Sequence, residues 1–190
     1  AEGQSVSAEK GYLRETGNLL FHLSLILILL GVSIGSLFGM RGEAIVNKGE
    51  RFISVPTSYD TLSFGKLSND ESLQPFVIEV IDFVAKYDLR TNAPQDYTAT
   101  VRVTNAGEKT STIKTIKVNS PLTFGNTRVY LQANGYSPIV TVRDSTGMVA
   151  LQGPVPFLPQ DGNLRSIGAI KVPDADPQVG FVGSFLPTYA

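Results

Sequence analysis

Residues Leu19 to Gly39 form an apolar run of 21 residues without a charged side chain. The polar side chains within it are His22, Ser24, Ser33 and Ser36. A helix of this length rises about 31 Å, which matches the hydrocarbon core of a bilayer. Signal peptides have shorter apolar runs, about 7–15 residues, and buried helices of soluble proteins are seldom so uniformly apolar. The pattern predicts a transmembrane helix over 19–39, with residues 1–18 as its N-terminal flank.

Gly31, Gly35 and Gly39 recur within this run at four-residue spacing. Small residues on one helix face let a second membrane helix approach closely, although glycine is also common in membrane helices generally. We expect this face to pack against another membrane helix, in the same protein or in a partner.

After residue 43 the pattern changes to that of β-strands. Phe76–Leu89 fits a strand or an amphipathic helix by period, and its β-branched and aromatic content favours a strand. Tyr97–Asn105 alternates cleanly and forms a hairpin with Ser111–Asn119 in this interpretation. Three more strands follow within 127–153, separated by turn residues.

These patterns together predict a membrane protein in which one transmembrane α-helix precedes a mainly antiparallel β domain over 43–190. We expect about 8 to 11 short strands, arranged as a sandwich or a partly open barrel. All 11 prolines follow the apolar run. We also expect this β domain to continue beyond residue 190.

Composition excludes several kinds of functional site from these residues. There are 16 basic and 17 acidic residues, mixed along the chain, so no basic stripe for nucleic acid is present. The chain has no cysteine, which excludes disulfides, thiolate metal sites and cysteine nucleophiles from these residues. Its one histidine lies in the apolar run, away from the β domain's serines, so no Ser-His-Asp set forms and no catalytic set is visible.

His22 is the candidate binding residue. Ionisable side chains inside membranes usually mark sites or pathways, and neutral imidazole is a good iron ligand. His22 also lies only about one turn inside the apolar run, where an interfacial histidine can bind water or lipid phosphate. Residue chemistry leaves both interpretations open. Met40, at the membrane exit, and Met148, after a turn, are weaker candidates as soft ligands.

Several aromatic residues lie near proline- and glycine-rich loops: Tyr130, Tyr136, Phe157 and Phe181. Aromatic side chains in a β domain usually pack in its core, and the alternative is a binding surface for a partner. The uncharged run Gly153–Pro159 (GPVPFLP) is predicted to be an exposed apolar loop.

Two stretches, read together, resemble a known family. RETGNLLFHLSLILILLGVSIGSLFG followed by RGEAIVNKGE resembles the third membrane span of the ResB/CcsB family and its exit into the extracytoplasmic domain. IKVNSPLTFGNTRVYLQANGYSPIVTVRD resembles the signature of that domain, a Val-Asn-x-Pro-Leu segment followed by a glycine and a Val-Tyr-Leu strand. GPVPFLPQDG resembles the form in actinobacterial members. The similarity runs from about Tyr12 to the end of the chain.

The resemblance implies a multi-pass protein of the plasma membrane with an extracytoplasmic β domain, which makes residues 1–18 a cytoplasmic flank. Such proteins belong to system II cytochrome c maturation. With a ResC/CcsA-type partner they carry haem across the membrane for attachment to apocytochrome c, so any enzymatic activity belongs to the complex. The resemblance also implies that His22 is one axial ligand of haem b, with a partner histidine as the other. The alternative is a non-enzymatic, membrane-anchored β domain that serves as a scaffold or sensor.

Overall fold

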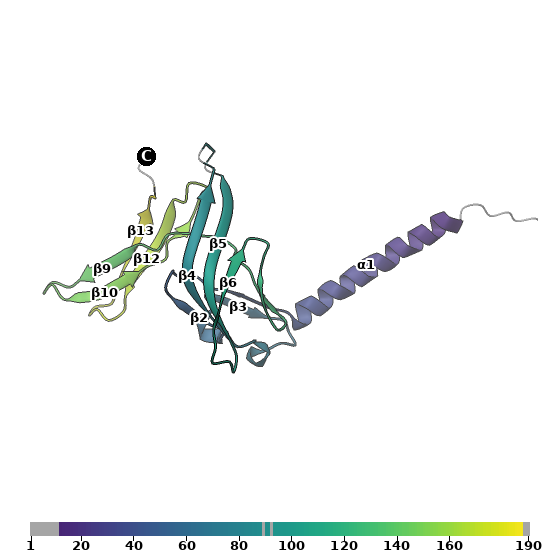
Figure 1. Ribbon diagram of the computed structural model, residues 1–190, viewed down its shortest axis with the longest axis horizontal. Helices are drawn as coiled ribbons and strands as arrows, with labels where there is room; N and C mark the ends of the chain where they lie inside the picture. Colours follow the sequence, from purple (N-terminus) through teal and green to yellow (C-terminus); the bar gives the residue numbers. More distant parts are fainter. Residues whose placement is uncertain (1–11, 89, 92, 188–190) are drawn as a thin grey trace, which may run out of the picture. The chain divides into compact units, whose positions relative to one another are not determined.

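The computed structural model describes residues 12–88, 90–91 and 93–187 (Figure 1). Residues 1–11, most of the predicted cytoplasmic flank, lie outside this part of the chain. Helix α1 (Tyr12–Phe38) is the one helix in the described residues that is long and apolar enough to cross a membrane. It starts before the apolar run and ends one residue before Gly39, and its 27 residues rise about 40 Å.

No proline interrupts α1, and Glu15 in its first turn complements the positive end of the helix dipole. Within its most apolar window no side chain is buried by the rest of the chain. A helix whose leucines and isoleucines have no protein cover requires lipid or other helices around it. The structure therefore confirms the predicted fold class, an apolar helix followed by a mainly antiparallel β domain.

Thirteen strands are present in the described residues, more than the 8 to 11 predicted, because several have only two to four residues. They are β1 (Met40–Glu43), β2 (Arg51–Ile53), β3 (Thr61–Phe64), β4 (Phe76–Tyr87), β5 (Pro94–Asn105), β6 (Thr112–Lys117), β7 (Leu122–Phe124), β8 (Thr127–Val129), β9 (Ile139–Arg143), β10 (Val149–Pro154), β11 (Leu158–Pro159), β12 (Ser166–Val172) and β13 (Val179–Phe185). Two 3-10 turns, η1 (Pro56–Ser58) and η2 (Asp70–Ser72), lie on either side of β3.

The strands form five separate sheets, and within the described part they do not close into a barrel. The largest sheet has the order β2-β4-β5-β6, and β11-β12-β13 form a second. The pairs β1-β3, β7-β8 and β9-β10 complete the set. The chain divides into two compact units: one joins the residues up to Gly42 with Leu62–Leu73, and the other contains Glu43–Thr61 and everything from Gln74 onward.

The main core lies on one face of the four-stranded sheet. Ala99, Val101 and Val103 alternate inward along β5, as predicted, and the last two are only 2% exposed. Burying a valine side chain of this kind contributes roughly 1.5–3 kcal/mol. Phe76 of β4 stacks on Phe124 of β7 with ring centroids 4.1 Å apart, so the β7-β8 hairpin covers this face. The predicted β5-β6 hairpin is confirmed.

The sequence-based prediction of an exposed Gly153–Pro159 loop is wrong at Phe157, which is 7% exposed. Its ring lies against Gly168 of β12, where an added Cβ would come within 2.6 Å of the ring. The absence of a side chain at Gly168 makes the space that this aromatic ring fills. Of the other three aromatic candidates, Tyr130 and Phe181 are about half exposed and Tyr136 is 39% exposed.

Candidate functional site

His22 lies on the exposed surface of α1, and its ring has a defined polar partner. The Nδ1 atom is 2.8 Å from the carbonyl oxygen of Asn18, one helical turn earlier. A carbonyl oxygen only accepts hydrogen bonds, so in the neutral imidazole Nδ1 carries the proton and Nε2 keeps its lone pair. Metal-binding histidines commonly have this arrangement, in which the second ring nitrogen donates to a backbone carbonyl and fixes the tautomer.

The residues around His22 change character along one face of α1. Glu15, Asn18, Leu19 and His22 share that face by their three- and four-residue spacing, and they line a shallow concave stretch. Phe21 contacts the imidazole edge-on, with ring centroids 5.6 Å apart. Toward the middle of the helix the same face continues with exposed apolar residues such as Ile26. His22 therefore lies where a polar helix end gives way to an apolar surface.

Gly31 and Gly35 lie on the opposite side of α1. They follow His22 by nine and thirteen residues, which turns each roughly 180° to 220° around the helix axis. A Cβ at either position would meet no atom of this chain. Gly39 differs from them: it comes after the helix end, and its amide donates to the Gly35 carbonyl at 2.8 Å.

The end of α1 is bound by a segment that sequence reasoning did not single out. The Leu67 amide donates to the Leu37 carbonyl at 2.9 Å, and Ser68 Oγ donates to the Phe38 carbonyl at 2.7 Å. The Gly65 amide also donates to the Gly39 carbonyl at 2.8 Å. These bonds satisfy carbonyls that every helix leaves without partners in its last turn. An added Cβ at Gly65 would collide with the Leu37 carbonyl.

Within α1, no second histidine, methionine or cysteine accompanies His22. Sixteen residues of helix, about 24 Å, separate His22 from the end of α1, which Met40 follows. Met148 is 69% exposed near the turn between β9 and β10. In the described part of the chain, no three His, Cys, Asp or Glu side chains come together in a way that could hold a metal ion.

Acidic residues of the large sheet form ion pairs with basic residues of neighbouring segments. Glu79 of β4 accepts from Arg102 at 2.7 Å and from Arg51 at 3.3 Å. The hydrogen bond from Arg102 is the main reason that the pKa of Glu79 is lowered from its ordinary value. Asp82 likewise accepts from Lys48 at 2.6 Å, which lowers the pKa of Asp82. These pairs stabilise strand register and leave no acid or base poised for catalysis among them.

Tyr97 provides one further perturbed group. Burial, together with a hydrogen bond to Tyr87, raises the pKa of Tyr97 to about 12. The Tyr87 hydroxyl also accepts from Asn134 Nδ2 at 2.8 Å. A phenol with so high a pKa stays neutral at physiological pH.

Comparisons with known proteins agree with the motifs. The chain is 28% identical over 163 residues to the "Cytochrome c biogenesis protein CcsB" of Microcystis aeruginosa, covering 85% of this chain and 35% of that protein. It is 30% identical over 154 residues to the "Cytochrome c biogenesis protein Ccs1" of Trieres chinensis, covering 81% and 34% of the two chains. It is 34% identical over 122 residues to the "Cytochrome c biogenesis protein Ccs1" of Heterosigma akashiwo, and the match covers 64% of this chain and 27% of that protein.

The chain thus spans about a third of the length of the first relatives that it matches. No solved structure matches it. A family model described as the ResB-like family matches residues 1–190. Because that match covers the whole chain, and the relatives carry CcsB and Ccs1 names, the resemblance read from the motifs is confirmed and this chain belongs to the ResB-like family.

Proposed function

We propose that the protein containing this chain is a subunit of the system II cytochrome c maturation complex. In this proposal it handles haem in the plasma membrane and, with a ResC/CcsA-type partner, delivers it for attachment to apocytochrome c. Family membership and relatives named as cytochrome c biogenesis proteins support this role. The exposed apolar surface of α1 supports a place in the membrane beside lipid or further helices.

The observation that carries the proposal is the hydrogen bond between His22 Nδ1 and the Asn18 carbonyl. It holds the imidazole in the tautomer whose Nε2 can bind iron, on a helix face where no other side chain of the described chain covers it. Haem b fits this donor: its iron accepts imidazole nitrogen, and its apolar ring suits the surface beside Ile26. When bound, the haem supplies a redox-active iron centre. His22 would hold and orient it.

A second ligand for the iron would come from outside this chain, because the chain has no second histidine. A histidine of the ResC/CcsA-type partner meets this requirement. We further propose that Gly31 and Gly35 pack against a membrane helix, whereas Gly39 completes the helix end. Because these two glycines lie opposite His22, the helix that packs on them is a different one from the helix that faces the haem.

A complementation assay tests the proposed function. A strain lacking the full-length protein receives wild type, His22→Ala or Ser24→Ala, and c-type cytochromes are detected by haem staining after denaturing electrophoresis. Ser24 is a matched control, since it lies at a similar depth on another face and its hydroxyl bonds to the Phe21 carbonyl. We expect His22→Ala to lower the cytochrome yield at least tenfold and Ser24→Ala to leave it unchanged.

Added imidazole tests separately whether His22 acts as a ligand. If His22 acts as a ligand, free imidazole occupies the space in His22→Gly and restores part of the yield. Normal cytochrome yield in His22→Ala, with equal protein levels, would contradict the ligand role. Normal c-type cytochromes in the strain lacking the protein would contradict the maturation role itself and favour an anchored scaffold or sensor.

A further inference from the structure

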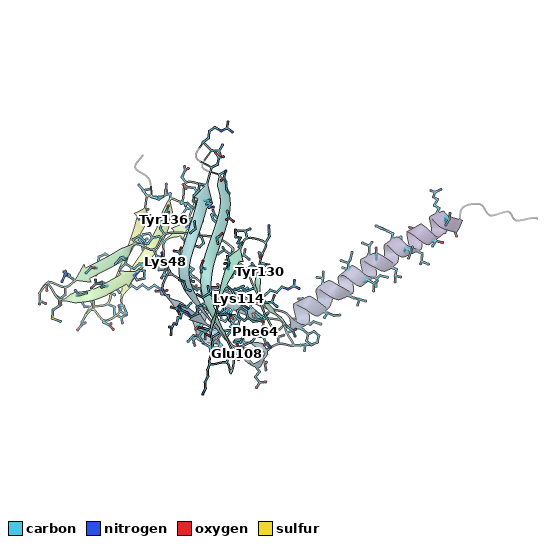
Figure 2. All side chains as sticks on the ribbon, in the orientation of Figure 1. Lys48, Phe64, Glu108, Lys114, Tyr130 and Tyr136 are labelled. Atoms are coloured by element: carbon cyan, nitrogen blue, oxygen red, sulfur yellow. The ribbon has the colours of Figure 1, made fainter. Side chains whose placement is uncertain are left out.

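The turn Gly65–Ser68 is fixed to the end of α1 rather than to the large β unit. Two hydrogen bonds connect Leu67 and Ser68 to the Leu37 and Phe38 carbonyls, and all four residues belong to the same compact unit. Figure 2 shows Phe64, which ends β3, beside this end of the helix. The turn therefore keeps a constant position relative to the last turn of α1.

That position corresponds to the edge of the hydrocarbon core. The apolar run of α1 ends at Phe38, and the first basic residue, Arg41, follows three residues later. A residue whose amide bonds to the Leu37 carbonyl lies within one hydrogen-bond length of the last helical turn, so it lies at the same depth. Leu67 is fixed at the boundary where acyl chains meet lipid headgroups.

The side chains of the turn match that environment. Leu67 is 63% exposed and Phe38 is 58% exposed, so the helix end and the turn both present apolar surface outward. Lys66, beside Leu67, is exposed and basic, and Arg41 adds a second positive charge three residues after the end of α1. Apolar side chains at the acyl boundary with lysine and arginine beside them are typical of surfaces that contact anionic lipid.

We propose that Gly65–Ser68 is a membrane-surface contact in which Leu67 inserts among lipid acyl chains and Lys66 binds lipid phosphate. This inference rests on α1 spanning the membrane. The turn then sets the depth at which α1 leaves the membrane, because the hydrogen bonds hold the turn and the end of α1 together. This arrangement requires glycine at position 65, since a larger residue would push the turn away from the helix end.

Spin-label accessibility tests the contact. The full-length protein carries a nitroxide at Leu67→Cys and is reconstituted in vesicles of equal parts phosphatidylcholine and phosphatidylglycerol, with any other cysteines replaced. Collision rates with oxygen, which partitions into lipid, and with a water-soluble nickel chelate are measured. Leu30→Cys, in the middle of α1, is the lipid reference, and Glu71→Cys, on exposed η2, is the reference outside the turn.

We expect the Leu67 label to collide more with oxygen than with nickel, at a ratio between those of Leu30 and Glu71. If the Leu67 label collides mainly with the nickel chelate, Leu67 lies in water. If it collides with neither reagent, Leu67 is covered by protein. Either result overturns the proposal. A nickel-dominated label at Leu30 would overturn it at a different step, by showing that α1 does not span the bilayer.

The Lys66 contact has its own control. Replacing phosphatidylglycerol by phosphatidylcholine should make the Leu67 label shallower, because the attraction between Lys66 and anionic phosphate is lost. The same exchange should leave the label unchanged in a Lys66→Gln background. Equal depth in both lipids with Lys66 intact would rule out phosphate binding by Lys66.

Discussion

At the residue scale, Gly65 has no room for a side chain against the end of α1. A Cβ there would lie 2.5 Å from the Ser36 carbonyl oxygen and even closer to that of Leu37. We predict that Gly65→Ala displaces the turn, costs about 1–3 kcal/mol by overpacking and lowers the melting temperature of the purified full-length protein. Hydrogen exchange at the Leu67 amide should accelerate as well.

Gly162→Ala is the matched control for this change. Gly162 lies in an exposed turn where an added Cβ meets nothing within 4 Å. It should leave both the melting temperature and the Leu67 exchange rate unchanged. Slow Leu67 exchange in Gly65→Ala would mean that the turn does not depend on close approach to the helix.

Phe157 is the residue whose truncation should most weaken the β11-β12-β13 region. Its buried ring contacts Gly168 and lies 6.3 Å from the ring of Phe185, centroid to centroid. Phe157→Ala should cost about 3–5 kcal/mol, measured as a loss of thermal stability. Phe181→Ala, at a half-exposed site, should cost much less. Equal effects of the two substitutions would contradict the burial of Phe157.

Residue-level chemistry was only partly predictable from the sequence. His22 stands out because a lone histidine in an apolar run is conspicuous, whereas the role of Gly65 depends on a contact with Leu37, 28 positions away. Phe157 was assigned to an exposed loop because its neighbours are prolines and glycines. Only the β12 backbone shows that Gly168 leaves space for its ring.

At the element scale, the β2-β4-β5 sheet carries a pH-dependent stabilisation. The pKa of Glu79 is lowered below its ordinary value of 4.5 by Arg102 and Arg51. Its carboxylate therefore stays charged to lower pH in the folded state than in the unfolded chain. The resulting stability is complete above pH 4.5 and is lost as pH falls through the lowered folded pKa.

We predict that Glu79→Gln flattens the fall in melting temperature of the full-length protein below pH 4.5. Glu71→Gln, on the exposed η2 turn, should leave the acid limb of the curve as it is in wild type. The measurement is a series of thermal unfolding curves across the acidic range. Identical pH profiles for wild type and Glu79→Gln would contradict a stabilising role for these ion pairs.

The glycine face of α1 gives a prediction at the same scale. Gly31→Leu combined with Gly35→Leu should disrupt packing with the neighbouring membrane helix, because close backbone approach needs small residues. We expect reduced recovery of the partner protein in mild-detergent pull-downs. Val32→Phe adds bulk between the glycine face and the His22 face, at a 66% exposed position, and should leave recovery unchanged. Full recovery with both glycines replaced would contradict packing of this face on a helix of the partner.

Long elements were predictable and short ones were not. The alternation in β5 extends over enough residues to reveal a period of two, and burial follows it, whereas β4 is recognised by its β-branched and aromatic content. Strands such as β1, β3 and β11 have two to four residues, too few to show a period. The return of Leu62–Leu73 to the helix end likewise has no local signal, because it is set by backbone bonds to α1.

At the scale of the whole molecule, the proposal places the N-terminal end of α1 in the cytoplasm and the β domain outside it. Single cysteines test this orientation in intact cells, using a membrane-impermeant maleimide on the full-length protein. Lys109→Cys, in the exposed loop between β5 and β6, should react in intact cells. Leu13→Cys, 90% exposed at the start of α1, should react only after permeabilisation. The reverse pattern would invert the orientation.

The central claim is that His22 holds haem iron within the membrane, and the visible absorption spectrum tests it most directly. The full-length protein is co-expressed with its ResC/CcsA-type partner and purified in mild detergent, as wild type and as His22→Ala. We predict a Soret band of six-coordinate, bis-histidine character in wild type that is lost, or shifts to a five-coordinate form, in the variant. Superimposable spectra of equal intensity would contradict the claim and assign the haem ligands to other residues.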